Sequence, residues 1–375
     1  MLKKTDKPYP LPKYYQISES IKEKIAGGEF VPGGKIPTYQ ILTKYFNTTM
    51  STICNAIQQL ENDGYIHTVR GKGMFVTVPA TVTDDADAAA ASWKVGLAMH
   101  TRGDLIQNLV EVLVHDLEKH DIDAFPLSTV LPNTNYYLKE KCLEKCIAKG
   151  IDTLVMDGSR DMPYKLLLKR RADFKQLNFL MHYNSAIDFP DANIIVFDYA
   201  GAGRLAAEHL IKAGREKFAF VTFKVASEAE RRRYGCRGAD ECHDMAMVSG
   251  MKSVLQEAGF PESCLTVIRE NAPFTEKNIT YFTELLKEGP WGIFAVGDFR
   301  TVEIYKAAAR IGLDFKQNLS IVGLYNTSWT EVLHPTLTSI SINETEIAHL
   351  AADCIINRKT GQRIVVEPKL IVRET

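Results

Sequence analysis

Residues 35–76 read KIPTYQILTKYFNTTMSTICNAIQQLENDGYIHTVRGKGMFV, and this stretch decides the fold of the first part of the chain. Apolar residues recur at helical spacing on both sides of the polar run Asn47–Thr52, which predicts two short helices joined by a tight turn. Hydroxyl residues in this run can cap the second helix, and a helix that buries one face can present the other to a DNA major groove. Glycines around Arg70 and Lys72 predict a basic hairpin tip that can reach phosphates or a minor groove. The order of these elements predicts a DNA-reading head.

The residues expected at the DNA surface come from the start of the first helix, the turn, the second helix and the hairpin tip. They are Thr38, Tyr39, Gln40, Thr48, Thr49, Met50, Ser51, Thr52, Asn55, Arg70 and Lys72. The alternative interpretation is an ordinary pair of surface helices with a solvated charged turn. We favour the DNA-binding interpretation because the helix pair and the basic hairpin follow each other in the right order.

This region resembles the winged helix-turn-helix of GntR-type bacterial transcription regulators. The resemblance covers residues 14–79 and is carried by the segments Ile36–Thr38, Leu60–Ile66 and Gly71–Val76. It implies binding to double-stranded operator DNA.

One departure from the family concerns base recognition. The family usually has base-reading arginines at the positions that Gln40, Met50 and Cys54 occupy here. Glutamine can form two hydrogen bonds with adenine, but methionine and cysteine cannot form the arginine–guanine pair. The resemblance therefore implies DNA binding without specifying the operator sequence.

Length and charge predict a second, larger domain. The chain has 375 residues, and residues 1–78 carry ten Lys and Arg against six Asp and Glu, although the whole chain has a net charge of −1. We therefore predict a basic DNA-binding domain at 1–79, a linker at 80–92 that is rich in Ala and Asp, and an acidic domain at 93–375. The sequence starts without a signal peptide and has no apolar run long enough to cross a membrane, so we expect a cytoplasmic protein.

The larger domain alternates short apolar strands with helices, which predicts an α/β fold with parallel sheets covered on both faces. Four stretches, Val196–Gly203, Ile293–Asp298, Leu319–Asn326 and Pro368–Glu374, resemble the effector domain of LacI/GalR-type repressors, which has the periplasmic-binding-protein fold. The whole chain is similar to the hybrid arabinose-type repressors of Gram-positive bacteria.

The resemblance implies two Rossmann-like lobes joined by three crossovers, and a homodimer formed through this domain. It assigns residues 93–198 and about 343–363 to lobe 1, and residues 199–342 and 364–375 to lobe 2. It also implies a repressor of carbohydrate utilisation genes; the alternatives are a ligand-dependent activator or a cytoplasmic sugar-binding protein of the same fold.

Ligands of such folds bind at the carboxyl ends of the parallel strands. Carboxylates, amides and aromatic rings there suit a sugar, because they pair with hydroxyl groups and cover apolar C–H faces. The resemblance singles out Asp298 as a partner of effector hydroxyls, and the alternative is that Asp298 only caps the following helix. The strand-end rule selects His100, Thr101, Arg102, Asp104, Asp157, His182, Tyr183, Asp298, Tyr325 and Asn326. From these we predict an effector site made of His100, Arg102, Asp104, Asp157, Tyr183, Asp298 and Asn326.

A further candidate is Arg233. The family places an effector-anchoring arginine three residues before a helix glycine, and Met247 stands there in this chain, before Gly250. The preceding loop is rich in arginine, so Arg233 could take over the anchoring role, on a sugar or a sugar phosphate. The alternative is a solvated surface loop.

Motifs of other functional classes are missing from the sequence. It has no Walker A motif, nucleophile elbow, HExxH helix or complete dinucleotide fingerprint, so we expect no enzyme and no cofactor. The seven cysteines lack zinc-type spacing, so we expect no metal, although Cys236, Cys242 and His243 could in principle bind zinc.

Overall fold

The computed structural model describes residues 13–31, 33–62, 65–69, 73–77, 93–99, 104–127, 140–158, 162–223, 227–238, 242–270 and 274–375. The chain divides into two compact units, Met1–Ala89 and Ala90–Thr375, and each is described by itself. The predicted linker at 80–92 lies outside the described residues, as do the hairpin-tip residues Arg70 and Lys72.

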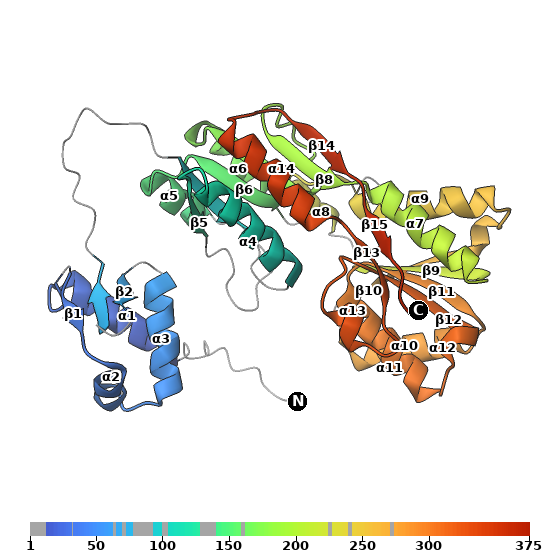
Figure 1. The fold of residues 1–375 in the computed structure, drawn as a ribbon, viewed down its shortest axis with the longest axis horizontal. Helices are drawn as coiled ribbons and strands as arrows, with labels where there is room; N and C mark the ends of the chain where they lie inside the picture. Colours follow the sequence, from blue (N-terminus) through green and yellow to red (C-terminus); the bar gives the residue numbers. More distant parts are fainter. Residues whose placement is uncertain are drawn as a thin grey trace. The chain divides into compact units, whose positions relative to one another are not determined.

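The first unit is a helical head with a small sheet (Figure 1). Its elements are α1 (Lys13–Ala26), β1 (Lys35–Ile36), α2 (Tyr39–Tyr45), α3 (Met50–Asn62), β2 (Ile66–Val69) and β3 (Gly73–Val76). The antiparallel sheet has the order β1-β3-β2. Ile21 of α1 and Ile53 and Leu60 of α3 are fully buried in one core, which explains why the apolar residues recur at helical spacing.

Lobe 1 of the second unit is a parallel six-stranded sheet of order β14-β8-β7-β6-β4-β5. Figure 1 shows α14 beside α4 on this lobe, and the two helices pack together. The elements are β4 (Lys94–Ala98), α4 (Asp104–Glu118), β5 (Asp123–Pro126), α5 (Glu140–Ala148), β6 (Thr153–Gly158), α6 (Tyr164–Lys169), β7 (Gln176–Tyr183), β8 (Asn193–Phe197), α14 (Glu344–Ile356) and β14 (Arg363–Val366).

Lobe 2 has a second six-stranded sheet, of order β10-β9-β11-β12-β13-β15, in which only the edge strand β15 is antiparallel. Its elements are α7 (Tyr199–Lys212), β9 (Lys217–Phe223), α8 (Glu228–Tyr234), α9 (His243–Glu257), β10 (Leu265–Glu270), α10 (Glu276–Leu286), β11 (Trp291–Ala295), α11 (Thr301–Arg310), α12 (Phe315–Asn318), β12 (Leu319–Leu324), α13 (Trp329–Val332), β13 (Thr338–Ser341) and β15 (Lys369–Ile371).

The chain crosses between the lobes after β8, after β13 and after β14. The last crossover differs from the predicted one at 363/364, because residues 363–366 pair with β8 of lobe 1. Alternating exposure along this edge strand, with Val365 61% exposed, weakens the apolar run that marks the other strands.

Helices α7 and α9 of lobe 2 approach each other backbone to backbone. A Cβ on Gly203 would lie 1.9 Å from the carbonyl oxygen of Met247, and one on Gly250 would lie 2.0 Å from that of Ala200. Met247 itself is fully buried in the core. These glycines therefore serve helix packing. Among the described residues, every helix is too short or too polar to cross a membrane.

Candidate functional site

The exposed surface of the head contains a groove between the start of α2 and α3. It has a volume of about 500 Å³ and is lined by Thr38, Tyr39, Gln40, Met50 and Cys54. These residues include the three positions where the resemblance would place arginines. The structure thus places four residues predicted at the DNA surface, Thr38, Tyr39, Gln40 and Met50, on one concave surface together with Cys54.

The turn before α3 stabilises that helix. The Thr49 hydroxyl accepts a hydrogen bond from the Thr52 amide at 3.3 Å and lies 2.8 Å from the Thr52 hydroxyl. This is the capping role that the sequence predicted for the hydroxyl residues of the run. Ser51 and Asn55 are exposed on the same helix, and Thr48 is partly exposed in the turn.

The second group of polar residues lies where strands of the two lobes end, and His182 of β7 is at its centre. The His182 Nδ1 lies 2.9 Å from Asp157 Oδ1 of lobe 1, and Nε2 lies 3.2 Å from the Tyr325 hydroxyl of lobe 2. Burial raises the pKa of Tyr325, so its hydroxyl stays protonated and can donate to Nε2. Nδ1 then carries the proton and donates to Asp157.

Aromatic rings surround this imidazole. The His243 ring, at the start of α9, lies 4.6 Å from the His182 ring, and the Tyr199 ring is stacked at 6.4 Å with an interplanar angle of 9°. Asp244 is buried next to His243 and accepts a 2.7 Å hydrogen bond from the Thr222 hydroxyl. We call His182, Asp157, Tyr199, Tyr325 and His243 the interlobe cluster.

The backbone is strained on both sides of the interlobe cluster. Met181, which precedes His182, has φ 65°, and the neighbours Tyr325 and Asn326 have φ 94° and 51°. Non-glycine residues adopt such values at a cost, and they concentrate at functional sites. The strain therefore supports a functional role for these strand ends.

Asp298 lies three residues after the end of β11 and is 1% exposed. Its Oδ2 accepts from the amide and hydroxyl of Thr327, at 2.7 and 2.8 Å, and Oδ1 accepts from the Ser339 hydroxyl at 2.6 Å. The side chain does not cap the helical turn that follows. A Cβ on Gly323 would lie 2.1 Å from Oδ1, so this glycine leaves the space that the carboxylate occupies.

Burial raises the pKa of Asp298 to about 6, against the hydrogen bonds from Ser339 and Thr327. Nearby, Glu270 and Arg300 form a buried ion pair, and burial raises the pKa of Glu270 to about 7 although Arg300 opposes the shift. The Arg300 guanidinium carbon also lies 3.3 Å from the centroid of the Phe223 ring.

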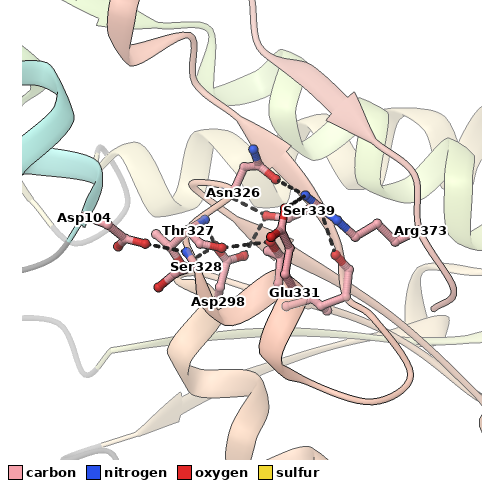
Figure 2. A network of polar contacts seen from close by, with 10 residues as sticks. Asp104, Asp298, Asn326, Thr327, Ser328, Glu331, Ser339 and Arg373 are labelled. Carbon is pink, nitrogen blue, oxygen red and sulfur yellow. Dashed lines mark hydrogen bonds and ion pairs between the residues drawn. The ribbon is translucent and has the colours of Figure 1, made fainter. Parts of the chain in front are cut away.

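Figure 2 shows the polar network around Asp298 and its link to lobe 1. The Asp104 carboxylate, in the first turn of α4, accepts a hydrogen bond from the Ser328 amide of lobe 2. Partial desolvation opposes ionisation of the exposed Asp104, but the Ser328 hydrogen bonds hold its pKa below the usual value. The Asn326 side-chain oxygen accepts from Arg373 at 2.9 Å. Asp104 and Asn326 are therefore close to the Asp298 network.

Two predicted effector residues lie elsewhere. Tyr183 follows His182 directly and points to the other face of the strand, where its ring lies 5.0 Å from that of Phe179. Arg233 is exposed on α8, with its guanidinium 5.5 Å from the Tyr234 ring. His100 and Arg102 lie outside the described residues.

The strand-end rule named His182 together with Tyr183, but the predicted effector site kept only Tyr183, and sequence reasoning assigned neither Tyr199 nor His243 to the site. His243 drew attention only as a zinc candidate with Cys236, but Cys236 is buried in the lobe 1 core and its Sγ lies 3.8 Å from the carbonyl oxygen of Met162. The strand-end rule found His182 because it lies at the end of an apolar strand. No local signal marks Tyr199 or His243.

A winged helix-turn-helix joined to a two-lobe α/β domain defines a class of DNA-binding transcription regulators. Residues 13–76 match the model of the gntR family of bacterial regulatory proteins, and residues 207–375 match that of the periplasmic binding protein-like domain. The chain therefore carries a GntR-type DNA-binding domain and a periplasmic-binding-protein-like domain in one polypeptide.

Known proteins share this combination over the full length. The arabinose metabolism transcriptional repressor of Halalkalibacterium halodurans is 23% identical over 392 residues, which cover 97% of this chain and 96% of that protein. The repressor of the same name from Geobacillus stearothermophilus is 23% identical, with coverage of 97% and 98%. A solved LacI family regulator from Enterococcus faecium, with bound ribose, has a TM-score of 0.59 at 17% identity and covers 75% of this chain and 97% of that chain.

These similarities confirm the predicted α/β fold class with a GntR-type head. They also confirm the prediction of a regulator instead of an enzyme, since the full-length relatives are named as transcriptional repressors. The likeness to the ribose-bound structure concerns the fold alone.

Proposed function

We propose that this chain is a transcriptional repressor of carbohydrate utilisation genes that binds operator DNA through the head and a sugar between the lobes. The observation that carries the proposal is the meeting of polar strand ends from both lobes at the interlobe cluster, close to a strained backbone. The names of the full-length relatives support a sugar-controlled operon.

The charges near the interlobe cluster favour an uncharged sugar over a sugar phosphate. Asp157, Asp244 and Asp298 supply carboxylates, which accept hydrogen bonds from hydroxyl groups and repel phosphate. Arg300 is already paired with Glu270, and Arg233 is exposed on α8. We therefore propose Asp157, His182 and Asp298 as the centre of the effector site, with Asp104 and Asn326 next to it.

The proposal for DNA binding assigns the predicted residues of the head, from Thr38 to Asn55, to the operator surface, together with Arg70 and Lys72. A homodimer formed through the two-lobe domain would present two heads, so the operator would contain two half-sites. Such a regulator acts on DNA in the cytoplasm.

Thermal unfolding in the presence of L-arabinose and D-ribose tests the effector site. A sugar at about 100 times its Kd should raise the unfolding temperature by about 5 °C, because it binds only the folded state. Asp157→Asn should remove that shift, whereas the matched surface variant Asp173→Asn, outside the strand ends, should keep it.

The same sugar should also release the full-length protein from operator DNA in a mobility-shift titration. Two outcomes would contradict the proposal. One is that saturating sugar leaves the DNA affinity of the wild-type protein unchanged. The other is that the wild-type protein and Asp157→Asn show the same sugar-induced thermal shift.

A further inference from the structure

The groove of the head has a composition that bears on which base pairs it reads. Met50 and Cys54 are one helical turn apart on α3, and Gln40 faces them from α2. All three are exposed, and Met50 is 45% exposed. Two soft, apolar side chains and one amide thus form the part of the surface that a base edge would enter.

Cations are absent from this groove among the residues the structure describes. The only Lys or Arg residues in 35–62 are Lys35 and Lys44, and neither lines the groove. The Lys35 side chain lies instead against Gly73 of the hairpin. Guanine is read most often by Arg or Lys, thymine by apolar contact with its methyl group, and adenine by Asn or Gln.

We propose that the head reads A·T pairs in each half-site, with Met50 and Cys54 against thymine methyl groups and Gln40 paired with adenine. The inference rests on the proposed DNA-binding function. Phosphate contacts elsewhere on the head add affinity without sequence information.

Selection of binding sites from random duplexes by the full-length protein tests the inference. Half-sites should contain A·T pairs at the positions that depend on Gln40 and Met50. Replacing dT by dU at the positions that depend on Met50 and Cys54 removes only the methyl group and should weaken binding about fourfold per base. The same replacement outside the half-site is the control.

Two variants should change the affinity or the base preference in a direction that the proposal predicts. Gln40→Ala should weaken binding roughly tenfold and relax selection at one adenine. Met50→Arg should shift selection at its position towards guanine, and thermal unfolding checks that each variant is folded. Selection of G·C pairs by the wild-type protein at these positions, or unchanged affinity after the replacement of dT by dU, would overturn this inference. Failure of the full-length protein to bind any DNA would overturn the proposed function itself.

A second, independent observation concerns residues 227–238, which we call the latch. The latch belongs to the connection between β9 and α9 of lobe 2, but it pairs with lobe 1. The Ala186 amide donates to the Gly235 oxygen at 3.0 Å, and the Arg237 amide donates to the Asn184 oxygen at 2.9 Å. These bonds place Ser185 opposite Cys236 as a non-hydrogen-bonded antiparallel pair.

The latch also packs into lobe 1. Cys236 is 7% exposed within the lobe 1 core, and Gly235 adopts φ 79°. A Cβ on Gly235 would lie 2.8 Å from the Ile187 side chain and 3.1 Å from that of Lys165. The contact thus needs glycine both for its backbone conformation and for its closeness.

The chain runs from the latch to His243, whose ring packs on His182 of lobe 1. We infer that the latch, which is docked on lobe 1 and continuous in sequence with α9 of lobe 2, restrains opening of the lobes at the interlobe cluster. The latch contact with lobe 1 differs from the three crossovers. The crossovers are continuous chain, whereas the latch is held on lobe 1 by hydrogen bonds and packing.

A Ser185→Cys variant tests the latch with the native Cys236 as its partner. Oxidised glutathione should accept two electrons and two protons from the thiols and leave one disulfide, because non-hydrogen-bonded pairs bring side chains close together. The locked protein should exchange the amide hydrogens of residues 325–328 about tenfold more slowly than its reduced form, since lobe opening is restricted.

Ser185→Ala, and Ser185→Cys combined with Cys236→Ser, are the controls and should not respond to the oxidant. If no disulfide forms, the latch is not docked on lobe 1. If the disulfide forms and exchange is unchanged, the latch does not control opening. Neither outcome depends on the identity of the effector.

Discussion

The two lobes share one architecture, a sheet with polar residues at the carboxyl ends of its parallel strands, but they treat charge differently. In lobe 2, Asp298, Glu270 and Arg300 are buried, and the partners given above come from lobe 2 itself. In lobe 1, Asp157 is partly exposed, and its partner His182 reaches Tyr325 of lobe 2. Lobe 2 is therefore organised internally, whereas lobe 1 completes its network through contact with lobe 2.

The largest effect should come from the buried ion pair of lobe 2. Arg300→Met leaves Glu270 without its cation and should lower the free energy of unfolding by about 3–5 kcal/mol, measured by urea denaturation. Arg310→Met removes an exposed ion pair with Glu276 and should cost at most about 1 kcal/mol. If both variants lose the same free energy of unfolding, the buried ion pair is no more important for stability than the exposed one.

A smaller effect should follow from filling the space beside Asp298. Gly323→Ala forces the carboxylate away from Ser339 and should cost about 1–3 kcal/mol, since overpacking displaces neighbouring side chains. Gly238→Ala, where a Cβ would meet nothing within 4 Å, is the matched control. A neutral Gly323→Ala variant would show that the Asp298 network is less rigid than its geometry indicates.

The titration of Asp298 sharpens the comparison further. Its folded pKa of about 6 lies above the ordinary value of 3.8, so the folded state binds this proton more tightly than the unfolded state. Its contribution to stability therefore falls as pH rises from about 4 to 6, by roughly 1–2 kcal/mol between pH 5 and 7.5. Asp298→Asn should remove that slope, seen as a pH-dependent difference from wild type in urea unfolding; a constant difference would contradict the shift.

The smallest effect is expected at the contact between lobes. Asp104→Asn weakens the acceptor of the Ser328 amide and should cost at most about 1 kcal/mol above pH 5, because Asp104 is exposed. The pKa of Asp104 is held down, so its contribution is present above the ordinary pKa and is lost as pH falls below it. Comparing the variant with wild type at pH 3 and pH 7 checks the sign.

The elements of the head could be predicted from the sequence because its signals are local. Helical spacing, the Thr49 cap and the hairpin glycines all lie within a short stretch, and each acts on its near neighbours. The buried strands β4, β6, β7, β9, β11 and β12 were equally legible, since strands buried on both faces are continuously apolar. The half-exposed edge strands β5, β10 and β14 were not among the predicted strands, because they lack a continuous apolar run.

The contents of the effector site were harder to predict because they depend on strand phase and on distant packing. The sequence named both His182 and Tyr183 at this strand end and placed Tyr183 in the site, but the structure turns His182 that way after the φ of 65° at Met181. Adjacent strand residues point to opposite faces, so a one-residue error exchanges the two side chains. The position of Arg233 depends on the latch, whose docking on lobe 1 involves partners far away in the sequence.

The backbone contact between α7 and α9 has a mechanical consequence. Both helices begin at the interlobe cluster, with Tyr199 and His243 as their first residues and their rings 5.4 Å apart. Because Gly203 and Gly250 bring the two backbones into direct contact, neither helix can move towards the other without a clash, so we expect the pair to move as one body. We therefore expect a ligand that displaces the Tyr199 or His243 ring to move both helices, each about 20 Å long, together.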